Sequence, residues 1–284
     1  MKLGLALSGG GIRGVVHIGV LKALEENDIK VDIIGGTSSG SLVAALYALG
    51  YSPVHIYHLF KRYGKVITNL GTGAVINSFG SYIINKKVNV SGINDGKIIE
   101  QLYNQFANKK EVYKMSDLKM KIVIPTTDIK NGKEYIFTNK IPNGKNKEKY
   151  ITDVPVGLAV RASSSFPAVF CPCEFKDHIF LDGGTVDNIP VKEVLAQGAD
   201  KVITVKFEKK EINNKSNAMD IVLRTIDIMG NKIIEEDLKK SDMILTIPLE
   251  NDVGLLDEKK IDSCYKYGYN TTIEKISEIK ELLQ

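Results

Sequence analysis

Residues 36–40 read GTSSG and match the G-x-S-x-G pattern of a nucleophilic serine, with Ser38 at its centre. In that pattern a strand enters a tight turn, a helix leaves it, and the flanking glycines remove Cβ atoms that would clash. The apolar pair Ile33-Ile34 precedes the turn and the run LVAALYAL follows it. An ordinary strand-to-helix turn is the alternative. The context favours a nucleophile elbow, with Ser38 as the nucleophile and Gly36 and Gly40 as the elbow glycines.

A second turn of small residues, SGGGIRG, covers residues 8–14 and follows the apolar run LGLALS. Successive glycines at the start of a helix can present backbone N–H groups to a negative charge, which the helix dipole also favours. That arrangement suits an oxyanion hole. The expected donors are the N–H groups of Gly10, Gly11 and Ile12, with Arg13 adding positive potential nearby.

The same turn has a rival interpretation, because Gly9, Gly11 and Gly14 also satisfy the G-x-G-x-x-G fingerprint of dinucleotide-binding proteins. That fingerprint needs an acidic residue at the far end of the second strand, where it holds the ribose. The nearest acid, Asp32, stands at the start of that strand, and the serine-rich turn occupies its far end. An oxyanion loop is therefore favoured, and neither a nucleotide nor a metal cofactor is expected.

A third motif, DGGTVDNIPV, covers residues 182–191 after an apolar strand-like run. An aspartate at a strand end, followed by Gly183 and Gly184, can be positioned by the backbone rather than by a long side chain. A simple D-G turn is the alternative. Asp187 and Asn188 are expected to cap the helix whose start is marked by Pro190.

The histidines decide which base can serve Ser38. A hydrolase triad on an elbow runs serine, acid, histidine along the chain. The four histidines are His17, His55, His58 and His178, and none follows Asp182. Triads of other topology stay open, but the economical arrangement is a dyad in which Asp182 itself takes the proton from Ser38. An exposed carboxylate is a weak base at neutral pH, and burial would raise its basicity.

Strand-like and helix-like segments alternate along the chain. Continuously apolar strands are expected at residues 3–8, 31–37, 121–127, 133–138, 178–181, 201–206 and 243–248. Helices are expected at 12–26, 41–49, from 53 onward, and at 153–162, 191–197, 218–238 and about 258–282. This order predicts an α/β fold, a three-layer α/β/α sandwich with a mostly parallel central sheet.

The segment 68–96 is the compositional outlier, because it is rich in Gly, Asn and Ser yet also carries apolar residues. A stretch this long with weak periodicity is typical of a lid or binding loop, and an irregular connection is the alternative.

Charge and cysteine content narrow the choice of partners and compartment. The net charge of +4 comes from 38 basic and 34 acidic residues that are interspersed, which is too balanced to indicate nucleic-acid binding. It is compatible with weak attraction to an anionic membrane surface. Three cysteines, Cys171, Cys173 and Cys264, are too few for a disulfide framework and are read as reduced thiols of a cytoplasmic protein. Neither a signal peptide nor a membrane-spanning run is expected.

Taken in order, GGGIRG, GTSSG and DGG resemble the motifs of the patatin-like phospholipase family, and VRASSSFPAVFCP (160–172) and DNIPV extend the similarity. That family works through a Ser–Asp dyad without histidine. The resemblance implies that Ser38 is the nucleophile, that Asp182 is the base, and that the loop from Gly9 to Gly14 supplies the oxyanion hole. Many members carry alanine where this chain has Gly184.

The resemblance also implies a single catalytic domain over residues 1–284, with its motifs between residues 3 and 250 and a helical extension at 250–284. The implied activity is hydrolysis of acyl ester bonds of phospholipids or lysophospholipids through an acyl-serine intermediate. The implied partner is a lipid substrate met peripherally at a membrane surface, while oligomeric state is left open. Alternatives are a catalytically idle lipid- or dinucleotide-binding protein, an acyltransferase, and a non-lipid esterase on the same site.

Overall fold

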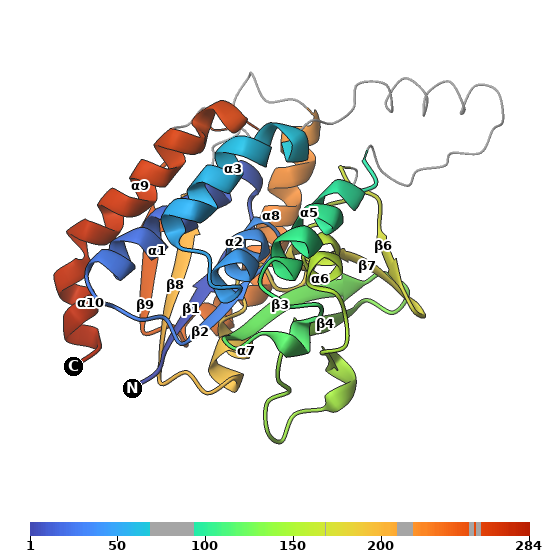
Figure 1. Cartoon of the computed structure of the whole chain (residues 1–284), viewed down its shortest axis with the longest axis horizontal. Coiled ribbons are helices and arrows are strands. Elements are labelled where there is room, and N and C mark those ends of the chain that lie inside the picture. Colours follow the sequence, from blue (N-terminus) through green and yellow to red (C-terminus); the bar gives the residue numbers. More distant parts are fainter. Residues whose placement is uncertain (69–93, 168, 209–217, 250–252, 254–256) are drawn as a thin grey trace.

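The computed structural model of the chain describes residues 1–68, 94–167, 169–208, 218–249, 253 and 257–284 (Figure 1). Within these residues the strands form one nine-stranded sheet. The strands are β1 (Leu3–Leu7), β2 (Ile33–Gly36), β3 (Lys121–Asp128), β4 (Lys133–Thr138), β5 (Tyr150–Ile151), β6 (Cys173–Phe175), β7 (His178–Asp182), β8 (Lys201–Phe207) and β9 (Met243–Ile247).

The strand order is β5-β4-β3-β2-β1-β8-β9, and β7 pairs with β3 and β6. The central strands β3, β2, β1, β8 and β9 are mutually parallel, whereas β4 and β7 run antiparallel to β3. The expected mostly parallel sheet is confirmed. The short strands β5 and β6 were not expected from the sequence.

The register around β3 brings two strand ends together. β2 pairs with residues 121–123 of β3, and β7 pairs with residues 126–128. Because β4 occupies the other edge of β3, β2 and β7 share one edge and run toward each other along it. Their carboxyl ends therefore converge beside Pro125.

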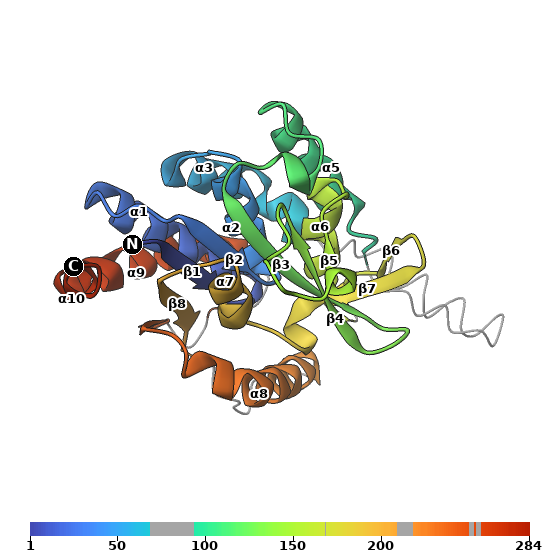
Figure 2. The same cartoon turned by 90° about the horizontal axis from the view of Figure 1, so that it is seen from below.

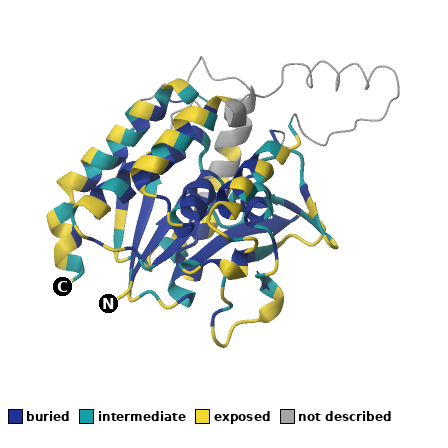
Figure 3. Ribbon diagram, viewed as in Figure 1, coloured by how far each residue is buried: buried dark blue, intermediate teal, exposed yellow. Residues whose placement is uncertain are grey.

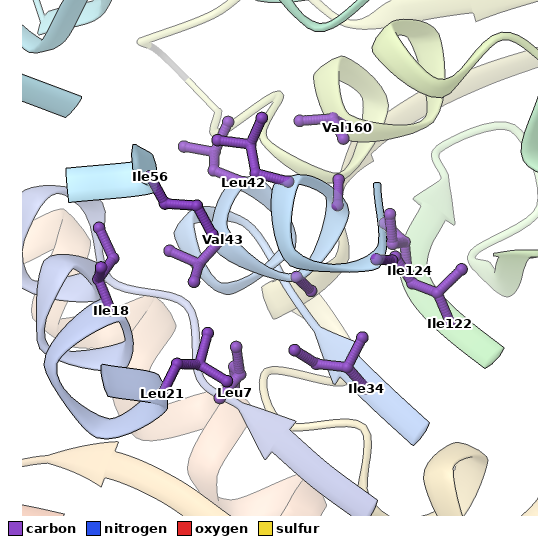
Figure 4. Packing of buried hydrophobic residues seen from close by; sticks show 14 of the residues in the cluster. Leu7, Ile18, Leu21, Ile34, Leu42, Val43, Ile56, Ile122, Ile124 and Val160 are labelled. Atoms are coloured by element: carbon purple, nitrogen blue, oxygen red, sulfur yellow. The ribbon is translucent and has the colours of Figure 1, made fainter. Parts of the chain in front are cut away.

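The central strands are continuously apolar because both faces of the sheet are covered. Leu5, Leu7, Ile34, Ile122 and Ile124 belong to the larger hydrophobic cluster, which helices α1, α2, α3 and α6 complete (Figure 4). Their neighbours along the strands, including Ala6, Ile33, Val123 and Val202, belong to a second cluster with side chains of α7. Figure 3 shows the sheet and the inner faces of the helices as the buried part of the molecule.

The helices lie on both sides of the sheet, with α7 and α8 on one side and α1, α2, α3, α5 and α6 on the other (Figure 2). This confirms the three-layer α/β/α fold. The helices are α1 (Val16–Glu26), α2 (Ser39–Ala48), α3 (Pro53–Thr68), α5 (Lys97–Asn108), α6 (Val156–Ser163), α7 (Val191–Ala196), α8 (Ala218–Leu238), α9 (Ile261–Glu274) and α10 (Ile276–Leu282), with a 3-10 turn, η1 (Gly11–Val15), before α1.

Several helices differ from the expected ones. Helix α1 begins at Val16, after η1, rather than at residue 12, and α2 begins at Ser39 rather than at residue 41. Helix α6 begins at Val156 rather than Asp153, because Pro155 disfavours helical geometry at the residue before it and occupies the N-cap position. The C-terminal helix is divided at Lys275 into α9 and α10. Helix α5 was not expected at all.

Most of the candidate lid at 68–96 falls on residues 69–93, which lie outside the described residues.

Helices α1 and α9 pack with their backbones in close contact. A Cβ added to Gly19 would lie 2.1 Å from the carbonyl oxygen of Tyr265, and one added to Gly268 would lie 2.0 Å from that of Val16. The end of the chain also returns to α1, because Lys280 donates to the side-chain oxygen of Asn27 at 3.0 Å. Both termini lie near the amino ends of the central strands (Figure 1). Among the described helices, none combines the length and apolarity needed to cross a bilayer.

Candidate active site

Ser38 occupies a strained turn between β2 and α2. Its backbone angles are φ 53° and ψ −121°, a region that a non-glycine residue adopts only when its surroundings enforce it. Those surroundings leave no room for side chains at the flanking positions. A Cβ on Gly36 would lie 2.3 Å from the carbonyl oxygen of Gly40, and a Cβ on Gly40 would lie 2.5 Å from that of Leu7. The strand–turn–helix geometry expected around Ser38 is therefore present.

Hydrogen bonds fix the backbone of Ser38 and do not engage its hydroxyl in helix capping. The N–H of Ser38 donates to Oγ of Ser163 at 3.1 Å, and its carbonyl oxygen accepts from Oγ of Ser41 at 2.6 Å and of Ser164 at 3.3 Å. Although Ser38 is the N-cap residue of α2, its side chain makes no capping hydrogen bond. The side chain of this half-buried residue stands at the positive end of the helix dipole.

Asp182 ends β7 and is 2% exposed. Its Oδ1 accepts from the N–H of Gly184 at 2.8 Å, so the turn orients the carboxylate as expected. Its own N–H donates to the carbonyl oxygen of Ser165 at 3.0 Å. The segment 163–165 is therefore in direct contact with both Ser38 and Asp182.

The residue before Ser38 and the residue after Asp182 are also close to each other. A Cβ on Gly183 would lie 2.4 Å from the carbonyl oxygen of Pro125 and 3.0 Å from Cγ2 of Thr37. Thr37 precedes Ser38 and Gly183 follows Asp182. The converging ends of β2 and β7 thus bring the elbow and the DGG turn to the same place.

The glycine loop lies beside the elbow because β1 and β2 are parallel neighbours, with Leu7 opposite Gly36. A Cβ on Gly9 would lie 3.0 Å from Cβ of Ser38, and one on Gly14 would lie 2.5 Å from Oγ of Ser39. The structure therefore brings together the elbow, the glycine loop and the DGG turn.

The N–H groups of the loop have different partners. That of Gly9 donates to the side-chain and backbone oxygens of Asn188, both at 3.2 Å. For Gly10 and Gly11, no acceptor is found among the described residues, as expected for the first residues of a helix. Arg13 is buried against the loop, where its Nε donates to the Gly10 carbonyl oxygen at 3.1 Å and its guanidinium lies 5.1 Å from the centre of the Phe207 ring.

The four histidines have other partners. The Nε2 of His17 contacts the carbonyl oxygen of Ser8 at 2.8 Å, and burial lowers the pKa of this imidazole to about 4. His178 pairs with Asp128 at 2.8 Å. His55 and His58 are exposed on α3. Among the contacts of the described residues, none joins a histidine to Ser38.

Asp187 and Asn188 do not cap α7, so that expectation is wrong. The N-cap residue is Pro190, three residues beyond Asp187, and no side chain caps it. The Asp187 carboxylate accepts from the N–H of Ile189 at 3.2 Å, and its backbone oxygen accepts from Oγ1 of Thr37 at 2.9 Å. This dipeptide contacts the elbow and the glycine loop instead. Burial, together with Glu134 and Glu193 nearby, raises the pKa of Asp187 well above its usual range.

In the part of the chain that the structure describes, no group of three or more His, Cys, Asp or Glu side chains is placed to hold a metal ion. The Cys173 thiol is buried, and burial raises its pKa to about 11.

A model of the patatin-like phospholipase family matches residues 5–195. The chain belongs to this family, a class of lipid acyl hydrolases. It is 29% identical over 296 residues to the lysophospholipase NTE1 of Scheffersomyces stipitis, with 94% of this chain and 17% of that protein covered. It is 32% identical over 208 residues to the lysophospholipase NTE1 of Yarrowia lipolytica, with 72% of this chain and 12% of that protein covered. The chain thus spans 12% to 17% of the length of these two relatives.

Solved structures share the fold at low sequence identity. ExoU of Pseudomonas aeruginosa, in its complex with SpcU, matches with a TM-score of 0.53 and 18% identity over 98% of this chain and 51% of that chain. Human GIVD cytosolic phospholipase A2 matches with a TM-score of 0.51 and 9% identity over 99% of this chain and 60% of that chain.

Proposed function

We propose that this chain is a serine lipid acyl hydrolase that cleaves acyl ester bonds of phospholipids or lysophospholipids. Ser38 is the nucleophile, and Asp182 is the general base that removes its proton. The family supplies the reaction class, and the lysophospholipase relatives favour the substrate class.

In this mechanism Oγ of Ser38 attacks the ester carbonyl carbon while its proton passes to the Asp182 carboxylate. The oxyanion that forms accepts hydrogen bonds from the N–H groups of Gly10 and Gly11, and from that of Ile12 at the same helix start. Collapse of the tetrahedral intermediate releases the alcohol, which takes the proton from Asp182, and leaves an acyl-serine. Water, deprotonated by Asp182, then attacks the acyl-serine and releases the fatty acid, and Ser38 regains its proton.

One observation carries the proposal: the strained Ser38 and the buried Asp182 are both hydrogen-bonded to the segment 163–165. A serine in a strained backbone conformation, with its hydroxyl not used for capping, is typical of a nucleophile elbow. The buried carboxylate, with one oxygen oriented by Gly184, fits a base that works without an imidazole.

We further propose that residues 1–284 act as one catalytic domain that meets lipid at a membrane surface from the cytoplasm. Helix α9 packs closely against α1, and α1 follows the glycine loop. This contact supports a single unit, because it joins the C-terminal part of the chain to an element of the candidate site. The role of a lid is kept as a hypothesis for the segment 68–96.

The test has two readouts. Wild-type protein is expected to react with an alkyl fluorophosphonate at Ser38, located by peptide mass spectrometry, because the probe needs an activated serine. The same protein, incubated with mixed phosphatidylcholine and lysophosphatidylcholine micelles, should release fatty acid, and lipid mass spectrometry would identify the bond that is cut.

Two variants serve as controls. Ser38→Ala should abolish both labelling and release, and Asp182→Asn should reduce release by about 10³-fold or more while the protein stays folded. Full activity in either variant would exclude the proposed Ser38–Asp182 dyad mechanism. Folded wild-type protein that neither labels nor releases fatty acid would favour a binding protein instead.

A further inference from the structure

The dipeptide Asp187-Asn188 connects the three motifs of the candidate site. The backbone oxygen of Asp187 accepts from Thr37 in the elbow, and both oxygens of Asn188 accept from Gly9 in the glycine loop. The N–H of Asp187 donates to the carbonyl oxygen of Gly183, within the DGG turn, at 2.8 Å. The contacts to Thr37 and Gly9 join segments that are far apart in the sequence, whereas the contact to Gly183 is local.

The side-chain oxygen of Asn188 occupies the central position. It lies 2.5 Å from the place that a Cβ of Gly9 would take, and 3.0 Å from the corresponding place on Gly184. The hypothetical Cβ of Gly9 also lies 3.0 Å from Cβ of Ser38. Asn188 and Ser38 therefore both pack against Gly9 and leave no room there for a side chain.

The N–H groups of the loop differ in whether they already donate to an acceptor. The N–H of Gly9 is taken by Asn188, whereas those of Gly10 and Gly11 have no acceptor among the described residues. Because the loop is fixed at Gly9, the direction in which the next N–H groups point is also fixed. Small errors in that direction matter, because an oxyanion donor acts only when it lies at hydrogen-bond distance from the developing charge.

We propose that Asn188 is a positioning residue that holds the glycine loop against Ser38, so that the N–H groups of Gly10 and Gly11 are aligned for the oxyanion. The inference rests on the proposed function. Asn188 touches no reacting atom; it acts through Gly9.

The first variant is Asn188→Ala, assayed with a soluble short-chain acyl ester. The backbone oxygen of Asn188 still accepts from Gly9, so the loop keeps its fold and loses alignment. We expect kcat to fall by about 10- to 100-fold with KM changed by less than about threefold, because alignment matters in the transition state rather than in substrate binding. Val186→Ala, in the same loop, is the matched control and should stay near wild-type activity.

A transition-state analogue separates positioning from general loss of structure. An alkyl trifluoromethyl ketone forms a tetrahedral adduct with a nucleophilic serine, and its oxyanion occupies the oxyanion hole. In Asn188→Ala its inhibition constant should rise by the same factor by which kcat/KM falls. An unchanged inhibition constant, or a loss confined to KM, would overturn the proposal.

A second variant keeps the inference testable if Asn188→Ala does not fold. Asn188→Asp retains an acceptor oxygen for Gly9, but its ionised form places a negative charge against the glycine loop that supplies the oxyanion donors. We expect the ratio of its kcat to that of wild type to be close to one at low pH and to fall as the introduced carboxyl ionises. A ratio that does not change with pH would contradict the assigned role.

The outcomes also distinguish this inference from the proposed function. If wild-type protein labels at Ser38 and hydrolyses the ester while Asn188→Ala retains wild-type kcat, only the role of Asn188 is wrong. If wild-type protein neither labels nor hydrolyses, both the function and the role of Asn188 are wrong.

Discussion

The backbone N–H of Ser38 donates to the hydroxyl oxygen of Ser163, at 3.1 Å, across a separation of 125 residues. Ser163 is fully buried at the end of α6. In most helix N-caps the side chain of the capping residue bonds within its own helix, whereas here a second helix bonds the backbone of the turn. The strained conformation of Ser38 is thus supported from outside the turn.

Replacing Ser163 with alanine should therefore affect both stability and catalysis. The variant leaves the N–H of Ser38 without its acceptor in a buried region, and we expect the free energy of unfolding to fall by about 2 kcal/mol. Esterase kcat should fall by about tenfold as the elbow loses support. Ser165→Ala is the control, because it also removes a buried serine hydroxyl, whose hydrogen bond goes to the carbonyl oxygen of Arg161 rather than to Ser38. Denaturant titration and ester kinetics measure both effects, and a Ser163→Ala variant equal to Ser165→Ala in both would contradict this account.

The elbow should not tolerate a methyl group at Gly40. Since a Cβ there would meet the carbonyl oxygens of Leu7 and Ser8 at 2.5 and 2.9 Å, the turn must move away from β1. We expect Gly40→Ala to lose about 2 kcal/mol or more of stability and most fluorophosphonate labelling. Ser39→Ala is matched to it, because the buried Oγ of Ser39 has no hydrogen-bond partner among the described residues. Equal labelling of the two variants would show that the close contact is not needed.

Acid should destabilise the fold through His17. Burial lowers the pKa of this imidazole from 6.5 to about 4, so between these values the unfolded chain binds a proton that the folded chain does not. The contribution of neutral His17 to the free energy of unfolding is therefore fully present above pH 6.5. It decreases by about 3 kcal/mol as the pH falls to 4. His17→Gln should show a shallower decrease in unfolding free energy over that range, whereas His58→Gln, at an exposed site, should retain the wild-type slope.

The C-terminal helix should depend on Gly268. A Cβ at this position would lie 2.0 Å from a backbone oxygen of α1, which cannot rotate away as a side chain could. Gly268→Ala should separate the helices and lower the thermal midpoint, with a loss of about 2–3 kcal/mol in stability. Asn270→Ala, on the exposed face of α9, should leave the midpoint unchanged or slightly higher. An unchanged midpoint in Gly268→Ala would argue against the close packing.

Much of the fold could be predicted because its strands are continuously apolar and its helices are periodic. The elbow was located from local sequence, since strand, turn and helix follow one another there. Helix α5 was overlooked although Ile99, Leu102, Tyr103 and Phe106 have helical spacing and are all buried. Strands β5 and β6 are only two and three residues long, too short to give a periodic signal.

The supporting residues of the site could not be predicted, for a physical reason. Asn188 and Ser163 act on backbone groups far away in the sequence, at Gly9 and Ser38. Nothing in their neighbours indicates those partners, and a local interpretation assigned Asn188 to helix capping. The family-like run of three serines at 163–165 marked the region without indicating that it contacts both Ser38 and Asp182.

The positions of the two chain ends have a practical consequence. The glycine loop follows the carboxyl end of β1 and the elbow follows that of β2, while Met1 and Gln284 lie at the opposite end of these strands (Figure 1). An affinity handle, a fluorophore or a surface linker joined at either end would therefore lie away from the candidate site. Immobilised molecules could be supplied with liposomes in flow and their turnover followed one by one.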